Sequence, residues 1–509
     1  MNASEPTITT LLASGAAGTT ALGSPGARPL SFGALRSAIA QTAETLAARG
    51  IGPGDRVAIV LDNGPEMAVA FLSVASGATA APLNPRYRAE EFEFYLTDLK
   101  ARLLITAQGK SSPALDVAAK LGIPVCWLAA QADGGAGSFT LEFPDGPAKR
   151  DGKPRAATPD DVALVLHTSG TTSRPKIVPL LQRNLVASAG HIRATLGFSP
   201  ADRGLCIMPL FHIHGLMTGL LAPLSAGGEV CCPPGFNALK FFAWMAEAHP
   251  TWYSGVPTMH QAILTRAGHN AEIIRANPLR FVRSSSSSLP TKVIAELESV
   301  FGAPVIESYG MTEASHQMTS NPLPPMPRKP GTVGPGAGPE VQVVDDRGNP
   351  VSPGTPGEIV IRGANVMGGY ENNPQANADA FVHGWFRTGD QGVMDGDGYV
   401  TITGRLKEII NRGGEKISPR EVDETIMAHA AVHQCVTFAL PHEVLGEEVA
   451  AAVVLRPGAA ASEKELRQFA ASRLADFKVP RKILILQEIP VGATGKLQRI
   501  GLAKKLGLA

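Results

Sequence analysis

Hydroxyl side chains are concentrated in one short segment, Thr168–Thr172, and Lys176 follows it. A buried strand is expected before this segment, at Val162–Leu166, and a helix after it, from about Gln182 to Leu196. A flexible loop between two such elements offers backbone N–H and hydroxyl donors that can hold phosphate oxygens. The G-x-x-x-x-G-K-[ST] pattern of common nucleotide-binding loops is absent, so the loop predicts a nucleotide triphosphate bound in a different fold.

A second segment with reactive side chains runs from Glu307 to Glu313, where a strand at Pro304–Ile306 is expected to end. Thr312 offers a hydroxyl there, and Glu313 offers a carboxylate. A carboxylate beside triphosphate oxygens is stabilised mainly by a shared Mg²⁺ ion, which neutralises both. The alternative is a turn at the end of a strand, with a capping threonine and a solvated glutamate.

Asp390 follows Gly389 at an expected glycine turn in the segment Gly384–Asp390. A carboxylate in this position can accept hydrogen bonds from both hydroxyls of a ribose, as acidic residues do in dinucleotide sites. An aspartate beside a glycine more commonly stabilises a β-turn, and that alternative stays open.

Two adjacent glycines, Gly413 and Gly414, allow a ligand to approach the backbone closely. Shortly after them, Ser418 and Pro419 are typical of a helix N-cap and first helical position, with Glu421 at the third. The alternative is a linker followed by a capped helix, with no ligand.

Lys496 ends the segment Gly492–Lys496, which contains two glycines and a threonine, near the end of the chain. In a flexible loop, a lysine can reach an anionic transition state as a mobile point charge. The alternative is a solvated lysine in a tail.

Short apolar strands alternate with helical patterns through most of the chain, as in the strands 56–61 and 79–83 and the helix 66–76 between them. This alternation predicts an α/β architecture with mostly parallel sheets. The segment 130–158 is rich in Gly, Ala, Asp and Pro, which predicts a surface excursion just before the phosphate loop.

Turn residues separate the strands from about residue 335 onward, which predicts a smaller β-rich subdomain over about 335–403. A domain boundary is expected at Lys407. It gives a large N-terminal domain, 1–406, and a small α+β C-terminal domain, 407–509.

The composition narrows the class of protein. Over 509 residues, 44% are hydrophobic and 18% charged, which is typical of a soluble globular enzyme. The net charge of +1 argues against a dedicated nucleic-acid binder. The five cysteines form no C-x-x-C pair, which favours reduced thiols and a cytoplasmic location. We expect no signal peptide and no membrane span, and a monomer or homodimer.

In their order and spacing, the five segments resemble the motifs of the adenylate-forming superfamily of acyl-CoA synthetases, luciferases and peptide-synthetase adenylation domains. The resemblance covers the chain from about residue 10 to residue 500. It implies that a carboxylic acid attacks the α-phosphate of ATP, giving an acyl-adenylate and pyrophosphate, and that a thiol then displaces AMP. The expected ligands are therefore ATP, Mg²⁺, coenzyme A and a small-molecule acid.

The resemblance also implies a role for each matching residue. Glu313 would meet Mg²⁺ and Thr312 the α-phosphate, while Lys496 would bridge carboxylate and phosphate in the first step. Lys407 lies at the family's hinge, about which the small domain would rotate. The other nucleotide contacts would come from Thr168, Ser169, Gly170, Thr171, Thr172, Lys176, Ser308, Tyr309, Gly310, Met311, Asp390 and Arg405, and the pantetheine arm of CoA would meet Gly413, Gly414 and Glu415.

The choice of acid depends on three further segments: Pro209–Gly215, Ser284–Ser288 and Ser315–His316. On an extended segment, His212 and His214 would point to one side, and a metal pair or buried histidines are the alternatives. The resemblance places the acyl gate at His212 and the pocket wall near the other two segments. The expected acyl contacts are therefore His212, His214, Ser286 and His316.

This set is polar, and burying its groups against an alkyl chain would leave them unpaired, at a cost of roughly 1–3 kcal/mol each. It therefore predicts a small polar acid with a second carboxylate. The segments 209–215, 308–324 and 410–419 are similar to those of the oxalate–CoA ligases of plants and fungi. Malonyl-CoA synthetases are the nearby alternative, but they commonly carry arginine where this chain has Ser308.

Two broader alternatives stay open. One is a ligase for another short, medium-chain or coumarate-like acid. The other, from a different class, is a CoA-independent or carrier-loading adenylation protein. An assay of the acid and of the CoA requirement separates the three.

Overall fold

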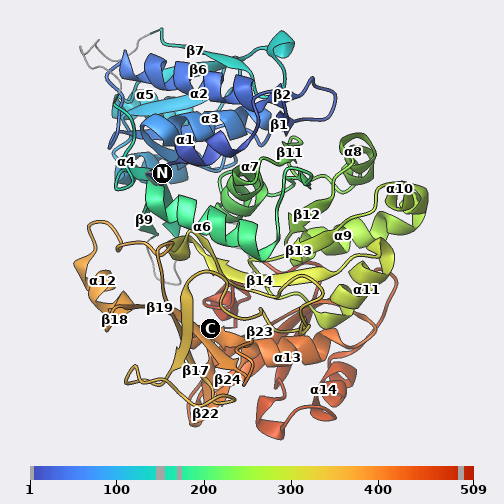
Figure 1. Ribbon diagram of the computed structural model, residues 1–509. Helices are drawn as coiled ribbons and strands as arrows, with labels where there is room; N and C mark the ends of the chain where they lie inside the picture. The colour runs from blue at the N-terminus through green and yellow to red at the C-terminus, as the bar shows by residue number, and fades with distance from the viewer. Residues whose placement is uncertain (1–4, 145–154, 169–174, 491–497, 509) are drawn as a thin grey trace. The chain divides into compact units, whose positions relative to one another are not determined.

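The chain divides into two compact units, whose helices and strands are labelled in Figure 1. A computed structural model describes residues 5–144, 155–168, 175–490 and 498–508. The first unit comprises Met1–Thr168, Lys176–Val341 and Ile361–Phe386, and the second chiefly Gln342–Val360 and Arg387–Ala509. The domain boundary expected at Lys407 stays a prediction.

A seven-stranded sheet forms one layer of the first unit, in the order β7-β6-β5-β3-β4-β8-β9. Its interior pairs are parallel, whereas β7 and β9 pair antiparallel at the two edges. The strands are β3 (Arg56–Val60), β4 (Thr79–Pro82), β5 (Leu103–Ala107), β6 (Val125–Ala130), β7 (Phe139–Glu142), β8 (Val162–Thr168) and β9 (Lys176–Leu181). Helices α2 (Phe32–Ala47), α3 (Pro65–Gly77), α4 (Ala89–Leu99) and α5 (Pro113–Leu121) alternate with them, which confirms the α/β prediction.

Both edge strands differ from expectation. Strand β7 lies inside the segment 130–158, which was predicted as a surface excursion, and it pairs with β6. Strand β9 returns antiparallel to β8, with Pro179 at the sheet edge where a missing N–H is tolerated. The predicted passage from strand through loop directly into a helix is therefore wrong, although helix α6 (Gln182–Thr195) begins where it was expected.

An eight-stranded sheet forms the other layer, in the order β15-β14-β13-β12-β10-β11-β1-β2. The pairs from β14 to β1 are parallel. Its strands are β1 (Thr20–Gly23), β2 (Leu30–Ser31), β10 (Arg203–Leu205), β11 (Glu229–Cys231), β12 (Trp252–Gly255), β13 (Phe281–Ser284), β14 (Val305–Met311) and β15 (His316–Ser320). Helices α8 (Phe241–Ala248), α9 (Pro257–Ala267) and α11 (Thr291–Phe301) share a buried core with this sheet.

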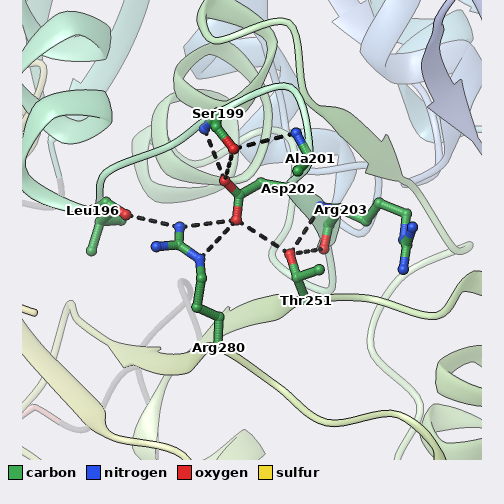
Figure 2. Close-up of polar contacts among 7 residues, drawn as sticks. All are labelled: Leu196, Ser199, Ala201, Asp202, Arg203, Thr251 and Arg280. Atoms are coloured by element: carbon green, nitrogen blue, oxygen red, sulfur yellow. Dashed lines mark hydrogen bonds and ion pairs between the residues drawn. The ribbon is translucent and has the colours of Figure 1, made fainter. Parts of the chain in front are cut away.

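Polar contacts tie together the beginnings of three neighbouring parallel strands, β10, β12 and β13 (Figure 2). Buried Asp202 accepts hydrogen bonds from the Ser199 backbone N–H at 2.8 Å and from Arg280 Nε at 2.9 Å. Arg280 also donates to the Leu196 carbonyl at 2.9 Å, and the Thr251 hydroxyl lies 3.3 Å from Asp202 Oδ1. Both oxygens of the buried Asp202 carboxylate have donor partners, so we interpret the network as structural.

A five-stranded sheet has the path β16-β17-β19-β18, with β20 paired to β19. The strands are β16 (Glu340–Val344), β17 (Gly357–Arg362), β18 (Phe381–Val382), β19 (Trp385–Met394) and β20 (Val400–Arg405). These strands lie in the region where a β-rich subdomain was expected. Among the described residues, no helix combines the length and apolar character that crossing a membrane requires.

The last sheet belongs to the second unit and follows the path β22-β21-β24-β23, with β25 parallel to β24. Its strands are β21 (Ile410–Arg412), β22 (Glu415–Ile417), β23 (Val432–His442), β24 (Gly446–Leu455) and β25 (Lys482–Leu486). Alternate residues of β24 enter two different cores, as the two-residue period of a strand requires. One core includes helices α13 (Pro419–Met427) and α14 (Glu463–Ala471), and the other includes α15 (Leu502–Lys505).

The Asp202 network predicts a stability effect. Asp202→Ala leaves Arg280 and the Ser199 N–H without their carboxylate, so the free energy of unfolding should fall by about 1–3 kcal/mol. Urea denaturation followed by tryptophan fluorescence measures this change. The matched control, Lys120→Gln, removes the exposed pair with Glu93 and should change the stability by about 0.5 kcal/mol or less. A loss for Asp202→Ala no larger than the control's would contradict a structural role.

Candidate active site

Several polar side chains of the first unit lie where parallel strands end. His214 follows β10, Ser254 lies near the end of β12, and Ser286 follows β13. Strand β14 leads into the segment that carries Glu313. In open α/β sheets, ligands bind at the carboxyl ends of the strands. The carboxyl ends of these strands are therefore the expected place for a ligand, whereas the Asp202 network lies at the beginnings of the strands (Figure 2).

The histidine segment is not extended, so the expectation that His212 and His214 point to one side of a strand is wrong. The His212 N–H donates to the Pro209 carbonyl in a turn, and the Leu216 N–H donates to the His212 carbonyl as a helix begins. The helix continues in π geometry over Gly215–Leu221, a form often found at functional sites. His214 is buried, whereas His212 is only partly buried.

Both ring nitrogens of His214 meet serine hydroxyls. Nδ1 lies 3.1 Å from Ser286 Oγ, and Nε2 lies 2.7 Å from Ser254 Oγ. The ring also stacks on His316, with the two centroids 4.8 Å apart and the planes 19° from parallel. We call these four residues the histidine cluster. It unites three of the predicted acyl contacts, and Ser254 is an addition that the sequence did not suggest.

The histidine cluster is electrically neutral and does not resemble a metal site. Burial lowers the pKa of His214 well below the ordinary histidine range, and burial together with the nearby Arg283 charge does the same for His316. Since both His214 nitrogens are within hydrogen-bond distance of hydroxyls, neither is left to coordinate a metal. In the part of the chain that the structure describes, no three His, Cys, Asp or Glu side chains gather as metal ligands.

Strands β14 and β15 approach each other too closely for a side chain at position 310. A Cβ atom added to Gly310 would lie 1.8 Å from the His316 carbonyl oxygen. The pairing register shifts between Tyr309 and Gly310, and Ser315 and His316 both have positive φ, 48° and 96°. Such strained backbone is typical of functional sites, and here it places His316 beside His214.

Arg283 also lies at this edge, and sequence reasoning missed it. It is completely buried within β13, and its guanidinium donates to Thr218 Oγ1 at 2.9 Å, His316 Nε2 at 3.1 Å and Gln317 Oε1 at 3.0 Å. The available signal was one charged residue directly before the serine run, in a strand that is otherwise buried.

The carboxylate of Glu313 lies beside Tyr370, another residue that sequence reasoning missed. Glu313 is buried, and the Tyr370 hydroxyl donates to its Oε1 at 2.8 Å. The Lys176 ammonium lies 4.4 Å from the centre of the Tyr370 ring. Tyr370 thus brings Lys176 and Glu313 together, although they are far apart in the sequence.

One buried carboxylate in this position fits a Mg²⁺ ion, because Mg²⁺ in nucleotide sites takes few protein ligands and fills its shell with phosphate oxygens and water. Thr312 directly precedes Glu313 and begins a short 3₁₀ turn, Thr312–Ala314. Upstream on β14, Ser308 and Tyr309 are buried, and the Ser308 hydroxyl lies 3.4 Å from the Ser284 carbonyl. Met311 ends the strand.

The two ends of the predicted phosphate loop lie opposite each other, because Thr168 of β8 pairs with Lys176 of β9. Ser169, Gly170, Thr171 and Thr172 lie outside the described residues, so their predicted contacts remain predictions. The same holds for Lys496.

In the second unit, the two residues expected at the ribose are neighbours. Asp390 pairs with Arg405 across strands β19 and β20, and Arg405 Nε lies 3.2 Å from Asp390 Oδ1. Asp390 is buried and lies within the long strand β19 rather than in a turn. The β-turn alternative for Asp390 is therefore wrong, and its carboxylate is held by an adjacent cation.

The glycines expected at CoA form the turn of a hairpin. Gly413 and Gly414 have φ of 59° and 100° and join β21 to β22, in which Arg412 pairs with Glu415. A two-residue turn with positive φ at both positions requires glycine or a similarly permissive residue, so the hairpin alone explains the pair. Lys407 lies in the 3₁₀ turn Leu406–Glu408 and is exposed.

The predicted helix cap is confirmed. The Ser418 hydroxyl accepts from the Glu421 backbone N–H, and Pro419 is the first residue of α13. The Glu421 carboxylate meets the ammonium of Lys478.

Comparisons with known proteins agree with the motifs. Residues 13–371 match the AMP-binding enzyme family, and residues 421–496 match the AMP-binding enzyme C-terminal domain. An oxalate–CoA ligase of Arabidopsis thaliana is 46% identical over 455 residues, which are 88% of this chain and 88% of that protein. An oxalate–CoA ligase of Saccharomyces cerevisiae is 43% identical over 471 residues, 87% of this chain and 86% of that protein.

A solved structure gives the same answer for the fold. ATP-bound MatB from Rhodopseudomonas palustris has a TM-score of 0.88 against this chain at 30% identity, and the match covers 98% of this chain and 99% of that one. Adenylate-forming CoA ligases use ATP, Mg²⁺ and CoA. The chain belongs to the AMP-binding enzyme family, and it is an AMP-forming acyl-CoA synthetase.

Proposed function

We propose that the acid activated by this enzyme is oxalate, so that oxalate, ATP and CoA give oxalyl-CoA, AMP and pyrophosphate. The observation that carries the proposal is the histidine cluster: its imidazoles and hydroxyls are buried at the carboxyl edge of the sheet, with Arg283 hydrogen-bonded to His316. Neutral His214 can accept a hydrogen bond from only one of its two serine hydroxyls, so one O–H is left to donate. A second carboxylate can accept that hydrogen bond, whereas an alkyl or aromatic acid cannot. The names of the Arabidopsis and yeast relatives support the same acid.

In the first half-reaction, one carboxylate oxygen of oxalate attacks the α-phosphorus of ATP, and the bond to pyrophosphate breaks. Lys176, Thr168 and the hydroxyls of the loop hold the departing phosphates, and Thr312 meets the α-phosphate. Glu313 would hold Mg²⁺, which offsets the negative charge of the phosphates when it is bound. Asp390 and Arg405 hold the ribose, and Lys496 bridges the attacking carboxylate and the phosphate.

In the second half-reaction, the sulfur of CoA attacks the oxalyl carbonyl carbon, and the bond to AMP breaks. The thiol proton leaves to solvent. We propose that Lys407 is the hinge about which the C-terminal domain, 407–509, moves between the two steps, and that His212 gates the acyl pocket. Gly413, Gly414 and Glu415 then face the pantetheine arm. Two steps with different geometric demands suit one mobile domain.

The acid can be tested by pyrophosphate release from oxalate, malonate, acetate, octanoate and 4-coumarate, each with and without CoA. Oxalate should exceed octanoate in kcat/KM by at least about 100-fold, because an alkyl chain can accept no hydrogen bond from this buried polar cluster. Octanoate outperforming oxalate would refute the polar-pocket argument. Equal product formation without CoA would favour a CoA-independent adenylation protein.

The role of Lys496 predicts a split between the half-reactions. Lys496→Ala should lower pyrophosphate release by about 100-fold or more, because it removes the charge that stabilises the first transition state. Thioester formation from supplied oxalyl-AMP and CoA should survive. The matched control is Lys504→Ala, an exposed lysine on α15, which should change neither step. Equal loss of both half-reactions in Lys496→Ala would contradict the assignment.

A further inference from the structure

Two arginines near one strand have opposite surroundings. Arg280, just before β13, is partly exposed and lies 2.9 Å from the carboxylate of Asp202 (Figure 2). Arg283, inside β13, is completely buried. Among the described residues, no carboxylate lies within ion-pair distance of its guanidinium, whose three partners are the neutral side chains of Thr218, Gln317 and His316. A buried cation without an anion is costly, so an anion from outside the chain is the natural complement.

The hydrogen bonds of Arg283 leave part of its capacity unused. Nη1 has two hydrogen-bond partners and Nη2 has one, but buried Nε has no partner in the described part of the chain. Burial lowers the pKa of Arg283 to about 9, which still leaves it charged at neutral pH. The strand therefore places an uncompensated positive charge beside the histidine cluster.

The contact between Arg283 and His316 fixes the proton of the imidazole. A guanidinium can only donate, so Nε2 of His316 must accept. The ring is then neutral and carries its proton on Nδ1. The His316 ring stacks on His214, whose own Nδ1 lies at Ser286, so Arg283 holds His316 as an N–H donor within the histidine cluster.

We propose that Arg283 determines specificity for an acid with a second carboxylate, by holding His316 as an Nδ1–H donor and by supplying the positive charge which that carboxylate neutralises. Arg283 acts through His316 and does not touch the reacting atoms, so it is a positioning residue. The inference deepens the proposed function and rests on it for the location of the acyl site. Arg283, which is not one of the predicted acyl contacts, would then favour doubly charged acids over singly charged ones.

A comparison of oxalate with oxamate tests the effect of the second negative charge, because the two acids have nearly the same shape. Oxamate has the same planar two-carbon skeleton and one carboxylate to be activated, but a neutral amide replaces the second carboxylate. The informative quantity is the ratio of kcat/KM for oxalate to kcat/KM for oxamate, measured by pyrophosphate release from the full-length enzyme with ATP, Mg²⁺ and CoA. A purely structural defect lowers both substrates together and leaves the ratio unchanged.

Arg283→Gln should lower this ratio by about 10- to 100-fold, the loss expected for one charged interaction, while Arg283→Lys should keep most of it. The matched control is Arg280→Gln, which breaks the ion pair with Asp202 and should reduce stability without changing the ratio. A ratio for Arg283→Gln equal to that of the wild type would overturn the inference.

Two further measurements cover other outcomes. If Arg283→Gln does not fold, His316→Leu removes the donor itself and should lower the ratio likewise; an unchanged ratio would overturn the inference. If the wild type does not activate oxalate, the proposed substrate is wrong, and the inference is then tested with malonate against its monoamide. Wild-type enzyme that activates no dicarboxylate in preference to its monoamide would overturn both.

Discussion

In the first unit, the candidate site depends on one tight reversal of the chain, between β14 and β15. The His316 carbonyl occupies the space where any side chain at Gly310 would lie, so the two strands can meet only at a glycine. Surrounding segments hold the reversal: Asn365 donates to the Ala314 and Gln317 carbonyls, and Ser188 donates to the Ser315 carbonyl. The positive φ values at Ser315 and His316 persist because these bonds stabilise them.

This reversal brings the residue proposed for the nucleotide's metal ion within a few positions of a residue proposed for the acid. Glu313 lies at its start, beside the Tyr370 hydroxyl, and His316 lies at its end, between His214 and Arg283. A shift of the reversal would therefore disturb the carboxylate of Glu313 and the imidazole of His316 together. The parallel strands β12 and β13 supply the remaining groups, because their carboxyl ends open on the same edge of the sheet.

Charge is handled differently at the two edges of this sheet. At the beginnings of the strands, Arg280 and Asp202 form an ion pair and neutralise each other (Figure 2). At the ends of the strands, Arg283 meets only neutral partners, and His214 and His316 are held uncharged by burial. The first arrangement stabilises the fold, whereas the second leaves a buried positive charge with no carboxylate partner among the described residues.

Local patterns predicted much of the fold. The strand expected at 79–83 and the start of α13 at Pro419 were placed correctly, because apolar runs and capping residues act within a few positions. The errors came where distant parts of the chain decide the backbone. The segment around His212 is a turn and a helix start, since Asn63 accepts a hydrogen bond from the Leu210 N–H. Asp390 is a strand residue because β20 pairs with it.

By itself, the sequence determined the order of the motifs, and with it the family and the chemistry at the α-phosphate, because each motif is a short run whose residue types are readable in place. Only the tertiary structure decided which polar groups share an environment. Ser254, Arg283 and Tyr370 lie outside the motifs and meet His214, His316 and Glu313 through sheet register and long-range packing. Whether a charge is neutralised depends on such neighbours, and these cannot be identified from the spacing of residues along the chain.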